Sequence, residues 1–391
     1  MIIDYVSTAM EVADFQELFQ ASPKMPGQQA QKYNRLMIEG LAANGVEVHA
    51  ISARPVTTKN CNRKYFPFAQ KISGKINWMY GPVLIFPFIK NLCQGIFAYR
   101  AVKKDCLKNN TAVVLDVLNV SVALGASLAA KKCHKPCIGI VTDLPEMMVT
   151  GTGRSQVNLV YKIMENCTGF VFLTQAMNEK ANHLHKPYTI VEALCDYKMK
   201  EMNPKIDVNS KKCIYAGLLD ARYGVKNMVE GFIAAQLPDA ELHLYGNGPY
   251  AEELKGLLQS HSNIIYHGAV LNHEVIKAEL EATLLVNPRP TREEFTKYSF
   301  PSKNMEYMAT GTPVLTTNLP GMPAEYKPYV FSIEDESVEG IARTFKQVLA
   351  LPTEQLRKKG LAARQFVLGK KNNLVQSQKV IGLIQKQLED K

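Results

Sequence analysis

The segment Cys213–Gly246, CIYAGLLDARYGVKNMVEGFIAAQLPDAELHLYG, contains the repeating unit that decides the fold. It opens and closes on apolar runs of strand length, CIYAG and ELHLYG. Between these runs, apolar side chains recur at the spacing of one helical face, namely Val225, Met228, Val229, Phe232 and Ile233. A strand, a helix and a second strand in this order predict two parallel strands joined by a crossover helix.

The same alternation runs through almost the whole chain. The strand-like runs of the first half are IIDYVS, VEVHAIS, AVVLDVL, CIGIVTD, GFVFLT and YTIVEA, and those of the second half are CIYAG, ELHLYG, NIIYHG, TLLVNP, PVLTT and YVFSI. Helical stretches such as 28–43 and 119–132 lie between most of them. This alternation predicts an α/β protein whose parallel sheets carry helices on both faces.

The chain is long enough for two domains, since it has 391 residues of which 46% are hydrophobic. The polar segment Cys195–Lys212 has no clear periodicity, so we place the junction there and expect a hinge near Asp196. Residues 1–195 and 196–370 are expected to form two doubly wound, Rossmann-like domains that face each other across a cleft. Residues 371–391 are expected to form a C-terminal helix that crosses back to the first domain.

The composition limits the classes of partner and compartment. A net charge of +10 suits nucleic acid, an anionic membrane surface or phosphorylated small molecules, and it also suits simple solubility. The basic residues are dispersed and form no stripe interleaved with aromatics, which argues against a nucleic-acid reader. Eight scattered cysteines and the absence of a signal peptide before the strand-like IIDYVS favour a reducing, cytoplasmic location.

Glycines mark the expected ligand-binding edge. Gly217, Gly246 and Gly268 each end a predicted strand, and in YGNGP the residues Asn247 and Gly248 extend the turn. Ligands of open parallel sheets bind outside the carboxyl ends of the strands, where glycine allows close approach to the backbone. The sequence therefore predicts a binding cleft at this edge, with free N–H groups in the YGNGP loop.

The stretch YSFPSKNMEYMATGTPVL, residues 298–315, predicts a short helix with Ser302 as its N-cap. The N–H groups of a helix N-terminus suit phosphate, and Lys303 adds a full positive charge. Glu306 leans back over the first turn, where its carboxylate could accept hydrogen bonds from a diol. Together these groups suit the ribose-diphosphate of a nucleotide. The alternative is a capped helix with a solvated lysine and an exposed glutamate.

At this point the chain resembles the retaining glycosyltransferases of family 4, which have the GT-B fold. The stretches YAGLLDARYGVKNMVEGF, LHLYGNGP, IIYHGAV and FPSKNMEYMATGTPVLTT follow the order and spacing of that family. VTDLPE and KMPGQQAQKYNRL resemble its acceptor-side elements, and the chain looks closest to enzymes of bacterial capsule or exopolysaccharide biosynthesis. The resemblance implies an acceptor-binding first domain, a nucleotide-sugar-binding second domain and retaining transfer to a lipid-linked saccharide at the inner membrane surface.

The resemblance also implies the site residues. Glu306 matches the glutamate that holds ribose, Gly217 and the Gly246–Gly248 loop match the diphosphate loops, and Val270 lies where the family's backbone meets the base. The expected donor-binding residues are Gly217, Arg222, Lys226, Gly246, Asn247, Gly248, Val270, Tyr298, Ser302 and Glu306. The expected catalytic residues are Lys303, Asp143 and Glu294. No tightly bound cofactor and no metal are expected, since no Asp-x-Asp cluster suggests one.

The chain departs from the family at several of these positions. Tyr298 stands where a first glutamate is expected, and Glu293 or Glu294 could substitute for it. Leu218 and Tyr223 stand where the family keeps its phosphate-binding arginine and lysine. The available replacements are Arg222, Lys226 and Lys303. Asp143 is the nearest match to a histidine near the sugar, and the loop 289–297 is expected to select that sugar.

Two other functions stay open from the sequence. One is an epimerase of the same fold, which would act on the nucleotide sugar without an acceptor. The other is a non-catalytic protein that binds an anionic membrane surface. We expect the segment Ile76–Tyr99, with Lys24, Lys32 and Arg35, to face a lipid-linked acceptor. Its apolar core GPVLIFPFI is too short to span a bilayer.

Overall fold

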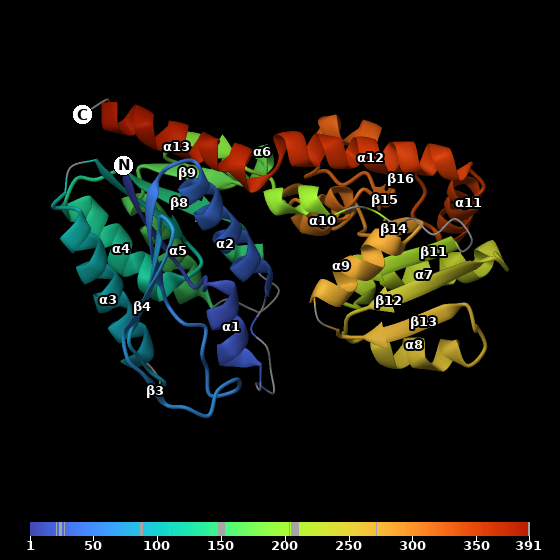
Figure 1. Ribbon diagram of the computed structural model, residues 1–391, viewed down its shortest axis with the longest axis horizontal. Helices are drawn as coiled ribbons and strands as arrows, with labels where there is room; N and C mark the ends of the chain where they lie inside the picture. Colours follow the sequence, from blue (N-terminus) through green and yellow to red (C-terminus); the bar gives the residue numbers. More distant parts are fainter. Residues whose placement is uncertain are drawn as a thin grey trace. The chain divides into compact units, whose positions relative to one another are not determined.

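A computed structural model describes residues 1–20, 22, 26, 28–86, 89–108, 110–147, 153–202, 204, 211–270 and 272–389, with the side chains of 28–30 excepted. The chain divides into two compact units. Unit 1 consists of Met1–Leu194 together with Asn373–Lys391, and unit 2 is Cys195–Asn372. Figure 1 shows that each unit has helices packed around its own sheet. The expected residue Lys24 lies outside the described residues.

The sheet of unit 1 has the strand order β10-β9-β8-β7-β1-β2-β5-β4, in which only the β4–β5 pair is antiparallel. Its strands are β1 (Ile2–Ser7), β2 (Glu47–Ser52), β4 (Ala69–Ser73), β5 (Ile76–Tyr80), β7 (Thr111–Asp116), β8 (Cys137–Val141), β9 (Gly169–Phe172) and β10 (Tyr188–Ile190). A separate antiparallel pair joins β3 (Tyr65–Phe66) to β6 (Val83–Leu84). The six strands predicted in this half are confirmed, and the β4–β5 hairpin was not predicted.

The helices of unit 1 are α1 (Val12–Phe19), α2 (Gln28–Ala43), α3 (Ile89–Asp105), α4 (Val120–Lys132), α5 (Arg154–Asn166), α6 (Gln175–Ala181) and α13 (Asn373–Glu389), with a 3-10 turn η1 (Pro145–Met147). Helix α13 packs directly on α2, because a Cβ at Gly40 would lie 2.2 Å from the carbonyl oxygen of Asn373. The Asn373 amide also donates a hydrogen bond to the Leu36 carbonyl (3.0 Å), and the Asn44 amide donates to the Leu374 carbonyl (2.8 Å). The last helix is therefore part of the core of unit 1.

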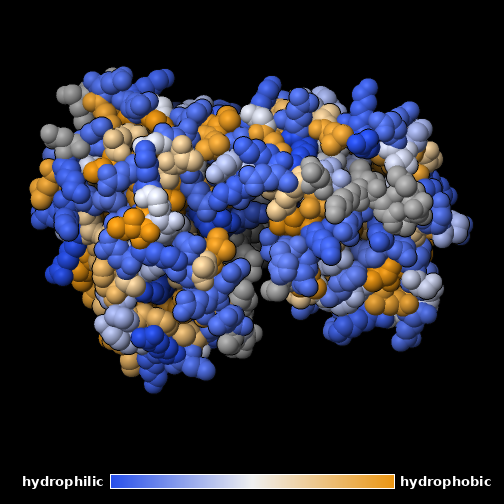
Figure 2. All heavy atoms as spheres, in the orientation of Figure 1, coloured by the Kyte–Doolittle hydropathy of each residue, from blue (hydrophilic) through white to orange (hydrophobic). Residues whose placement is uncertain are grey.

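The segment expected to face a lipid divides into a buried part and an exposed part. Ile76, Trp78 and Tyr80 of β5 are buried in the core, so the expectation is wrong for them. Their alternating apolar residues cover the sheet, as a strand with one buried face requires. In contrast, Ile89, Leu92 and Ile96 of α3 are exposed on the surface. Figure 2 shows hydrophobic side chains gathered on this part of unit 1. Among the described residues, no helix is both long and apolar enough to cross a bilayer.

The sheet of unit 2 is fully parallel and has the order β13-β12-β11-β14-β15-β16. Its strands are β11 (Lys211–Ala216), β12 (Ala240–Tyr245), β13 (Ile264–Gly268), β14 (Leu284–Asn287), β15 (Val314–Thr317) and β16 (Phe331–Ile333). Its helices are α7 (Val225–Ala235), α8 (Ala251–Leu258), α9 (Asn272–Glu281), α10 (Ser302–Thr310), α11 (Val338–Leu349) and α12 (Thr353–Lys370). Short 3-10 turns are η2 (Tyr197–Glu201), η3 (Ala221–Tyr223), η4 (Glu294–Lys297) and η5 (Ala324–Tyr329). All six predicted strands are confirmed.

Both sheets reverse their strand order at one point. In unit 2 the reversal falls between β11 and β14, and in unit 1 it falls between β1 and β7. Loops on the two sides of such a point leave the sheet in opposite directions, which opens a crevice at the carboxyl ends of the strands. The predicted α/β fold with doubly wound parallel sheets is therefore confirmed, and each unit has its own position for a ligand.

Candidate functional site

Two loops meet at the carboxyl ends of β11 and β12. The N–H of Gly217, directly after β11, donates a hydrogen bond to the carbonyl of Tyr245 (2.9 Å). Gly246 has a φ of +128°, and a Cβ there would lie 1.9 Å from the carbonyl oxygen of Gly217. Only glycine fits at position 246, because any other residue would meet both the strained φ and this collision. The two backbones thus lie in contact at the carboxyl ends of β11 and β12, beside the switch point between β11 and β14.

The loop from Gly246 to Gly248 is bonded to its surroundings. The N–H of Gly246 donates to the carbonyl of Gly268 (2.7 Å), and the N–H of Gly248 donates to Oδ1 of Asn247 (2.8 Å). A Cβ at Gly248 would lie 2.2 Å from the carbonyl oxygen of Leu219. The expectation of free N–H groups is therefore wrong for Gly246 and Gly248. An anion reaches the N–H of Gly248 only after the Asn247 amide has moved.

Helix α10 is joined to the end of β11. The Tyr307 hydroxyl accepts a hydrogen bond from the N–H of Ala216 (2.9 Å), one residue before Gly217. The helix begins at Ser302, and its N-cap is Pro301, which is extended (φ −72°, ψ 95°) and offers no side-chain cap. The prediction of Ser302 as N-cap is wrong, because the extended cap position lies one residue earlier and Ser302 belongs to the first turn. The first-turn N–H groups therefore lack a side-chain cap, and among them the N–H of Asn304 donates to the Pro301 carbonyl (2.9 Å).

Lys303 and Glu306 form an ion pair on the first turn of α10. Lys303 Nζ lies 3.7 Å from Glu306 Oε2, and the side chains are 30% and 12% exposed. The carboxylate leans back toward the helix start, in the direction that side chains of a helix adopt. The structure thus brings a cation and a mostly buried carboxylate together beside the uncapped N–H groups.

A buried amide holds α10 against the sheet. The Asn304 side chain is fully buried; it accepts a hydrogen bond from the Asn287 amide (2.7 Å) and donates one to the Thr316 hydroxyl (3.1 Å). Asn287 and Thr316 lie at the ends of β14 and β15. A buried polar side chain with both hydrogen bonds made fixes the position of its helix. Nothing in the local sequence pattern predicts this pairing.

The two expected cations near β11 are paired with carboxylates. Arg222 Nη2 lies 2.6 Å from Asp220 Oδ2, and this guanidinium holds the pKa of Asp220 below its ordinary value. Lys226 Nζ lies 2.8 Å from Glu253 Oε1. Leu218, at the position of the family's arginine, is 48% exposed. Both cations are therefore bound to acidic neighbours in this structure.

Arg289 is a cation at this edge that the sequence analysis did not single out. Its guanidinium carbon lies 5.0 Å from the centre of the Tyr223 ring and 5.2 Å from that of Phe295. The two rings meet edge to face at 6.3 Å. Stacking on aromatic faces is a common way to hold an arginine. The available signal was its position two residues after β14, at the switch point.

The remaining expected residues are spread over both units. Val270 follows β13 and is 37% exposed, whereas Tyr298 is half-buried after η4. Glu294 is exposed at the start of η4. Asp143 is exposed in unit 1, two residues after the end of β8. The structure therefore places Lys303 and Glu294 in one unit and Asp143 in the other.

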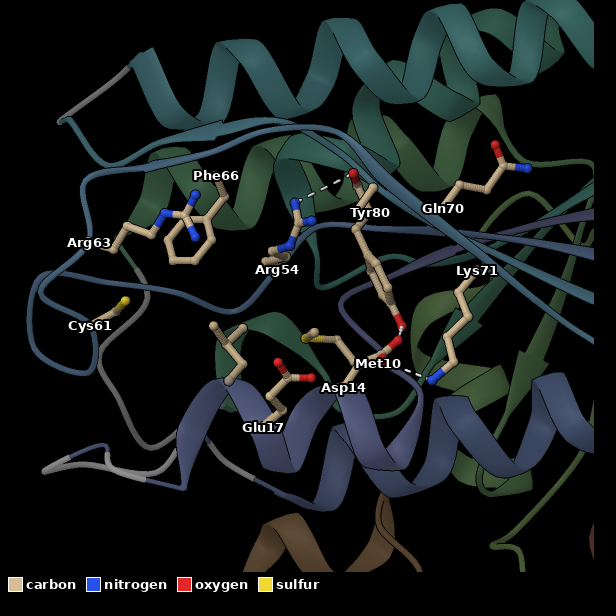
Figure 3. A pocket seen from close by; sticks show the side chains of 12 residues that line it. Met10, Asp14, Glu17, Arg54, Cys61, Arg63, Phe66, Gln70, Lys71 and Tyr80 are labelled. Atoms are coloured by element: carbon tan, nitrogen blue, oxygen red, sulfur yellow. Dashed lines mark hydrogen bonds and ion pairs between the residues drawn. The ribbon is translucent and has the colours of Figure 1, made fainter.

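Unit 1 has a pocket of about 660 Å³ that the sequence analysis did not predict (Figure 3). It lies where β1, β2 and β5 end, since Ser7, Ser52 and Tyr80 are in register across these strands. It is lined by Met10, Asp14, Glu17, Leu18, Arg54, Cys61, Arg63, Phe66, Ala69, Gln70, Lys71 and Tyr80. Cationic, anionic and aromatic side chains all face it.

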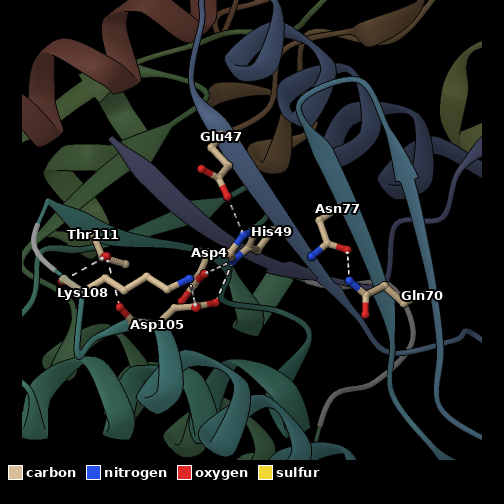
Figure 4. Close-up of polar contacts among 8 residues, drawn as sticks. All are labelled: Asp4, Glu47, His49, Gln70, Asn77, Asp105, Lys108 and Thr111. Atoms are coloured by element: carbon tan, nitrogen blue, oxygen red, sulfur yellow. Dashed lines mark hydrogen bonds and ion pairs between the residues drawn. The ribbon is translucent and has the colours of Figure 1, made fainter.

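A second polar cluster lies inside unit 1 (Figure 4). Asp4, His49 and Asp105 bring their ligand atoms within 4.8 Å of one another, which is close enough for a metal ion. His49 Nδ1 lies 2.6 Å from Asp105 Oδ2, and Nε2 lies 3.2 Å from a Glu47 carboxylate. Lys108 Nζ also lies 2.9 Å from Asp105 Oδ1. Because both ring nitrogens face carboxylates, we interpret the group as a buried imidazolium with its counterions.

The pKa values of the cluster follow from these contacts. Hydrogen bonds to Asp105 and Asp4 raise the pKa of His49 to about 10. Burial raises the pKa of Asp4 to about 7. Burial opposes ionisation of Asp105, but its hydrogen bonds to His49 and Lys108 prevail and lower its pKa to about 2. Near neutral pH the cluster therefore holds more protons than the same residues would hold in water.

Comparisons with known proteins concern both the sequence and the fold. Residues 198–366, in unit 2, match the model of the family described as glycosyl transferases group 1. A search of curated proteins found no match. Among solved structures, sucrose-phosphate synthase from Thermosynechococcus elongatus is 16% identical at a TM-score of 0.69 and covers 100% of both chains.

Two further solved structures contain nucleotide ligands. Anabaena HepE in complex with UDP is 10% identical, has a TM-score of 0.63 and covers 99% of this chain and 100% of that one. A trehalose-6-phosphate protein from E. coli bound with UDP-2-fluoro glucose is 9% identical, has a TM-score of 0.67 and covers 98% and 99%. The likeness extends over the whole chain in each case and confirms the predicted GT-B fold.

Proposed function

We propose that this chain, a glycosyltransferase with a group 1 domain in unit 2, transfers a sugar with retention from a nucleotide-diphosphate donor to a lipid-linked saccharide. The observation that carries the proposal is the contact between Gly217 and Gly246 at the ends of β11 and β12, joined through Tyr307 to helix α10. This geometry gives close backbone approach and uncapped helix N–H groups at one edge, as a diphosphate requires. Polysaccharide biosynthesis of the capsule or exopolysaccharide type is the proposed context.

Each donor-binding side chain has a proposed role. Lys303 and the first turn of α10 face the diphosphate, and Glu306 accepts hydrogen bonds from the ribose hydroxyls. Their 3.7 Å ion pair supports this division, because a cation and a carboxylate side by side match a phosphate beside a diol. Val270 lies beside the base, and Tyr298 and Ser302 line the same edge. Uracil is the first base to test, because two of the similar structures contain UDP or a UDP sugar.

The proposed reaction needs no metal and no tightly bound cofactor. The bond from the anomeric carbon to the diphosphate oxygen breaks, and a bond from the acceptor oxygen forms on the same face. The acceptor proton passes to the leaving phosphate. Negative charge grows on the diphosphate during this step, so Lys303 and the helix N–H groups stabilise the transition state more than the ground state. Asp143 and Glu294 are proposed to contact the sugar.

The acceptor is proposed to be presented at the inner face of the cytoplasmic membrane. Helix α3 supports this, because its residues Ile89, Leu92 and Ile96 are exposed by 45%, 64% and 43% at helical spacing. The exposed cations Arg100 and Lys103 follow on the same helix. An apolar stripe followed by basic residues binds anionic lipid weakly and reversibly.

A panel of nucleotide sugars tests the proposed function. A bound donor stabilises the folded state by mass action, so the correct nucleotide sugar should raise the melting temperature in proportion to the logarithm of its concentration. Turnover of that donor should then require a saccharide acceptor. Turnover without an acceptor, giving an isomerised sugar, would instead assign an epimerase. If no nucleotide sugar raises the melting temperature, the proposal fails.

A further inference from the structure

The pocket of unit 1 has an uneven distribution of charge (Figure 3). Arg54 and Arg63 share one aromatic ring, since their guanidinium carbons lie 5.8 Å and 4.9 Å from the centre of Phe66. Both arginines come from the loop that follows β2. Within the part of the chain that the structure describes, neither guanidinium forms an ion pair with a carboxylate. The two neighbouring cations repel each other.

Arg54 is held rigidly in this position. It is only 7% exposed and donates hydrogen bonds to the carbonyls of Pro67 (3.1 Å) and Gly81 (2.6 Å). Its guanidinium also stacks on the Tyr80 ring at 5.2 Å. Burial is the main cause that lowers the pKa of Arg54; the charge of Arg63 acts in the same direction, and Tyr80 and Asp14 oppose it. A fixed guanidinium of this kind is ready to bind a planar or tetrahedral oxyanion.

The acidic residues of the pocket lie at its other side. Asp14 accepts a hydrogen bond from the Tyr80 hydroxyl (2.5 Å) and forms an ion pair with Lys71 (2.9 Å). Its charge is therefore already balanced. Glu17 has no ion-pair partner among the described residues, and Figure 3 shows its carboxylate pointing into the pocket. A carboxylate in this position would repel a nearby phosphate but would accept hydrogen bonds from sugar hydroxyls.

We propose that this pocket binds an acceptor that carries a phosphate ester next to a sugar or isoprenoid group. Arg54 and Arg63 hold the phosphate, Phe66 and Tyr80 contact the apolar face of the adjoining group, and Glu17 accepts a hydrogen bond from a hydroxyl. The inference rests on the proposed function, since it gives the chemical class of the acceptor. A lipid-linked diphosphate and a free sugar phosphate share this chemistry.

Direct binding without a donor tests the pocket. Farnesyl diphosphate represents the lipid-linked source and glucose 6-phosphate the soluble source, with farnesol and glucose as controls that lack phosphate. The probes are titrated by calorimetry in saturating UDP, which occupies the donor edge if the proposed function is correct. Binding of either phosphate probe, tighter than its control by about tenfold or more, is expected from a charge-assisted contact.

Matched variants locate the binding. Arg63 and Lys64 are adjacent and both exposed, but only Arg63 lines the pocket. Arg63→Ala should weaken the binding of the phosphate probe by about tenfold, whereas Lys64→Ala should leave its affinity unchanged. Glu17→Gln should tighten farnesyl diphosphate, because it removes a repelling charge. Equal affinity in the Arg63→Ala and Lys64→Ala variants, or no phosphate probe bound by the wild type, overturns the inference.

Cysteine protection gives a second readout on the unaltered protein. Cys61 lines the pocket and Cys133 ends α4 away from it, and both are free and half-buried. A bound phosphate probe should slow alkylation of Cys61 and leave Cys133 unchanged, as measured by mass spectrometry. Loss of UDP binding with intact probe binding would instead reject the proposed donor site alone. Protection of Cys61 by farnesol and glucose as strongly as by the phosphate probes would contradict the phosphate assignment.

Discussion

Both units expose the carboxyl ends of parallel strands, but the surfaces at these two edges differ in chemistry. In unit 2, Gly217 follows β11 and Gly246 follows β12, and the backbone itself lies at the edge. In unit 1 the strands at the corresponding edge are followed by side chains, above all Arg54 and Tyr80. The comparison teaches that such an edge can expose closely packed backbone in one unit and charged side chains in the other. Function is placed on the fold by these residues and not by the strand order.

The largest expected effect concerns the cation of unit 2. Lys303→Ala should lower kcat by about 10²-fold or more, because the charge it faces grows as the glycosidic bond breaks. Glu306→Ala should mainly raise KM for the donor, since ribose changes little during the reaction. Steady-state kinetics on both variants checks this.

Arg222→Ala and Lys226→Ala serve as comparisons for Lys303. Both cations are paired with carboxylates, so we expect smaller losses of kcat in these variants. If Lys303→Ala keeps the wild-type kcat while Arg222→Ala abolishes activity, Arg222 is the phosphate cation and the assignment of Lys303 is wrong.

The next effect tests whether the backbone of unit 2 forms the binding surface. Gly246→Ala places a methyl group 1.9 Å from the Gly217 carbonyl oxygen and should separate the two loops. Donor affinity should fall by about tenfold or more, measured by calorimetry, because small displacements of a binding loop are costly. Gly256→Ala in α8 is the control, since nothing lies within 4 Å of its added Cβ. Equal donor affinity in both variants would refute a backbone-lined site.

A smaller effect is that the stability of unit 1 should depend on pH in a way that the stability of unit 2 does not. The pKa of His49 is raised to about 10, so its contribution to stability is complete below its ordinary value of 6.5 and is lost as pH rises through 10. The raised pKa of Asp4, about 7, acts in the same direction, because its ionisation on going from pH 3.8 to 7 opposes folding. The free energy of unfolding of unit 1 should therefore fall with rising pH, by at most about 1.4 kcal/mol per pH unit for each proton.

Hydrogen exchange checks this prediction unit by unit. Amides of β1 and β2 should lose protection between pH 7 and pH 10 after correction for intrinsic rates, whereas those of β11 and β12 should not. His49→Gln should remove the change in this range. A wild-type protein whose two units lose protection equally would show that the cluster does not govern the stability of unit 1.

The smallest expected effect concerns the membrane. Flotation with anionic vesicles should recover part of the protein, and less at high salt, because the attraction of exposed lysines and arginines is screened. Leu92→Ser should reduce recovery, since Leu92 is the most exposed residue of the α3 stripe at 64%. Leu361→Ser in unit 2, where the side chain is 38% exposed, is the control. Equal recovery with neutral vesicles would contradict the electrostatic part of the proposal.

The sequence predicted those features that depend on local periodicity. The parallel strands and the bounds of α2 follow from apolar spacing, and the structure confirms both. The resemblance to glycosyltransferases follows from motifs around Gly217 and Glu306, and residues 198–366 match the model of glycosyl transferases group 1. The β4–β5 hairpin was missed because the apolar residues of β5 merge with the apolar run that follows. These predictions succeeded where one segment of chain contains the whole pattern.

The sequence could not predict contacts between distant segments. His49 and Asp105 are 56 residues apart in the sequence. Asn304 of α10 pairs with Asn287 at the end of β14. The stacking of Arg289 on Tyr223 likewise depends on the fold bringing two loops together. The N-cap of α10 was displaced by one residue because Pro301 adopts the extended conformation that Ser302 was expected to have.

The position of α13 in unit 1 has a consequence for how the chain is made. A ribosome releases residues 1–194 well before it synthesises Asn373, so the Asn373 contacts with Leu36 and Gly40 cannot form at that stage. Unit 2, in contrast, is continuous from Cys195 to Asn372 and can fold as soon as it has emerged. The nascent first unit therefore keeps an uncovered α2 surface until α13 has been synthesised.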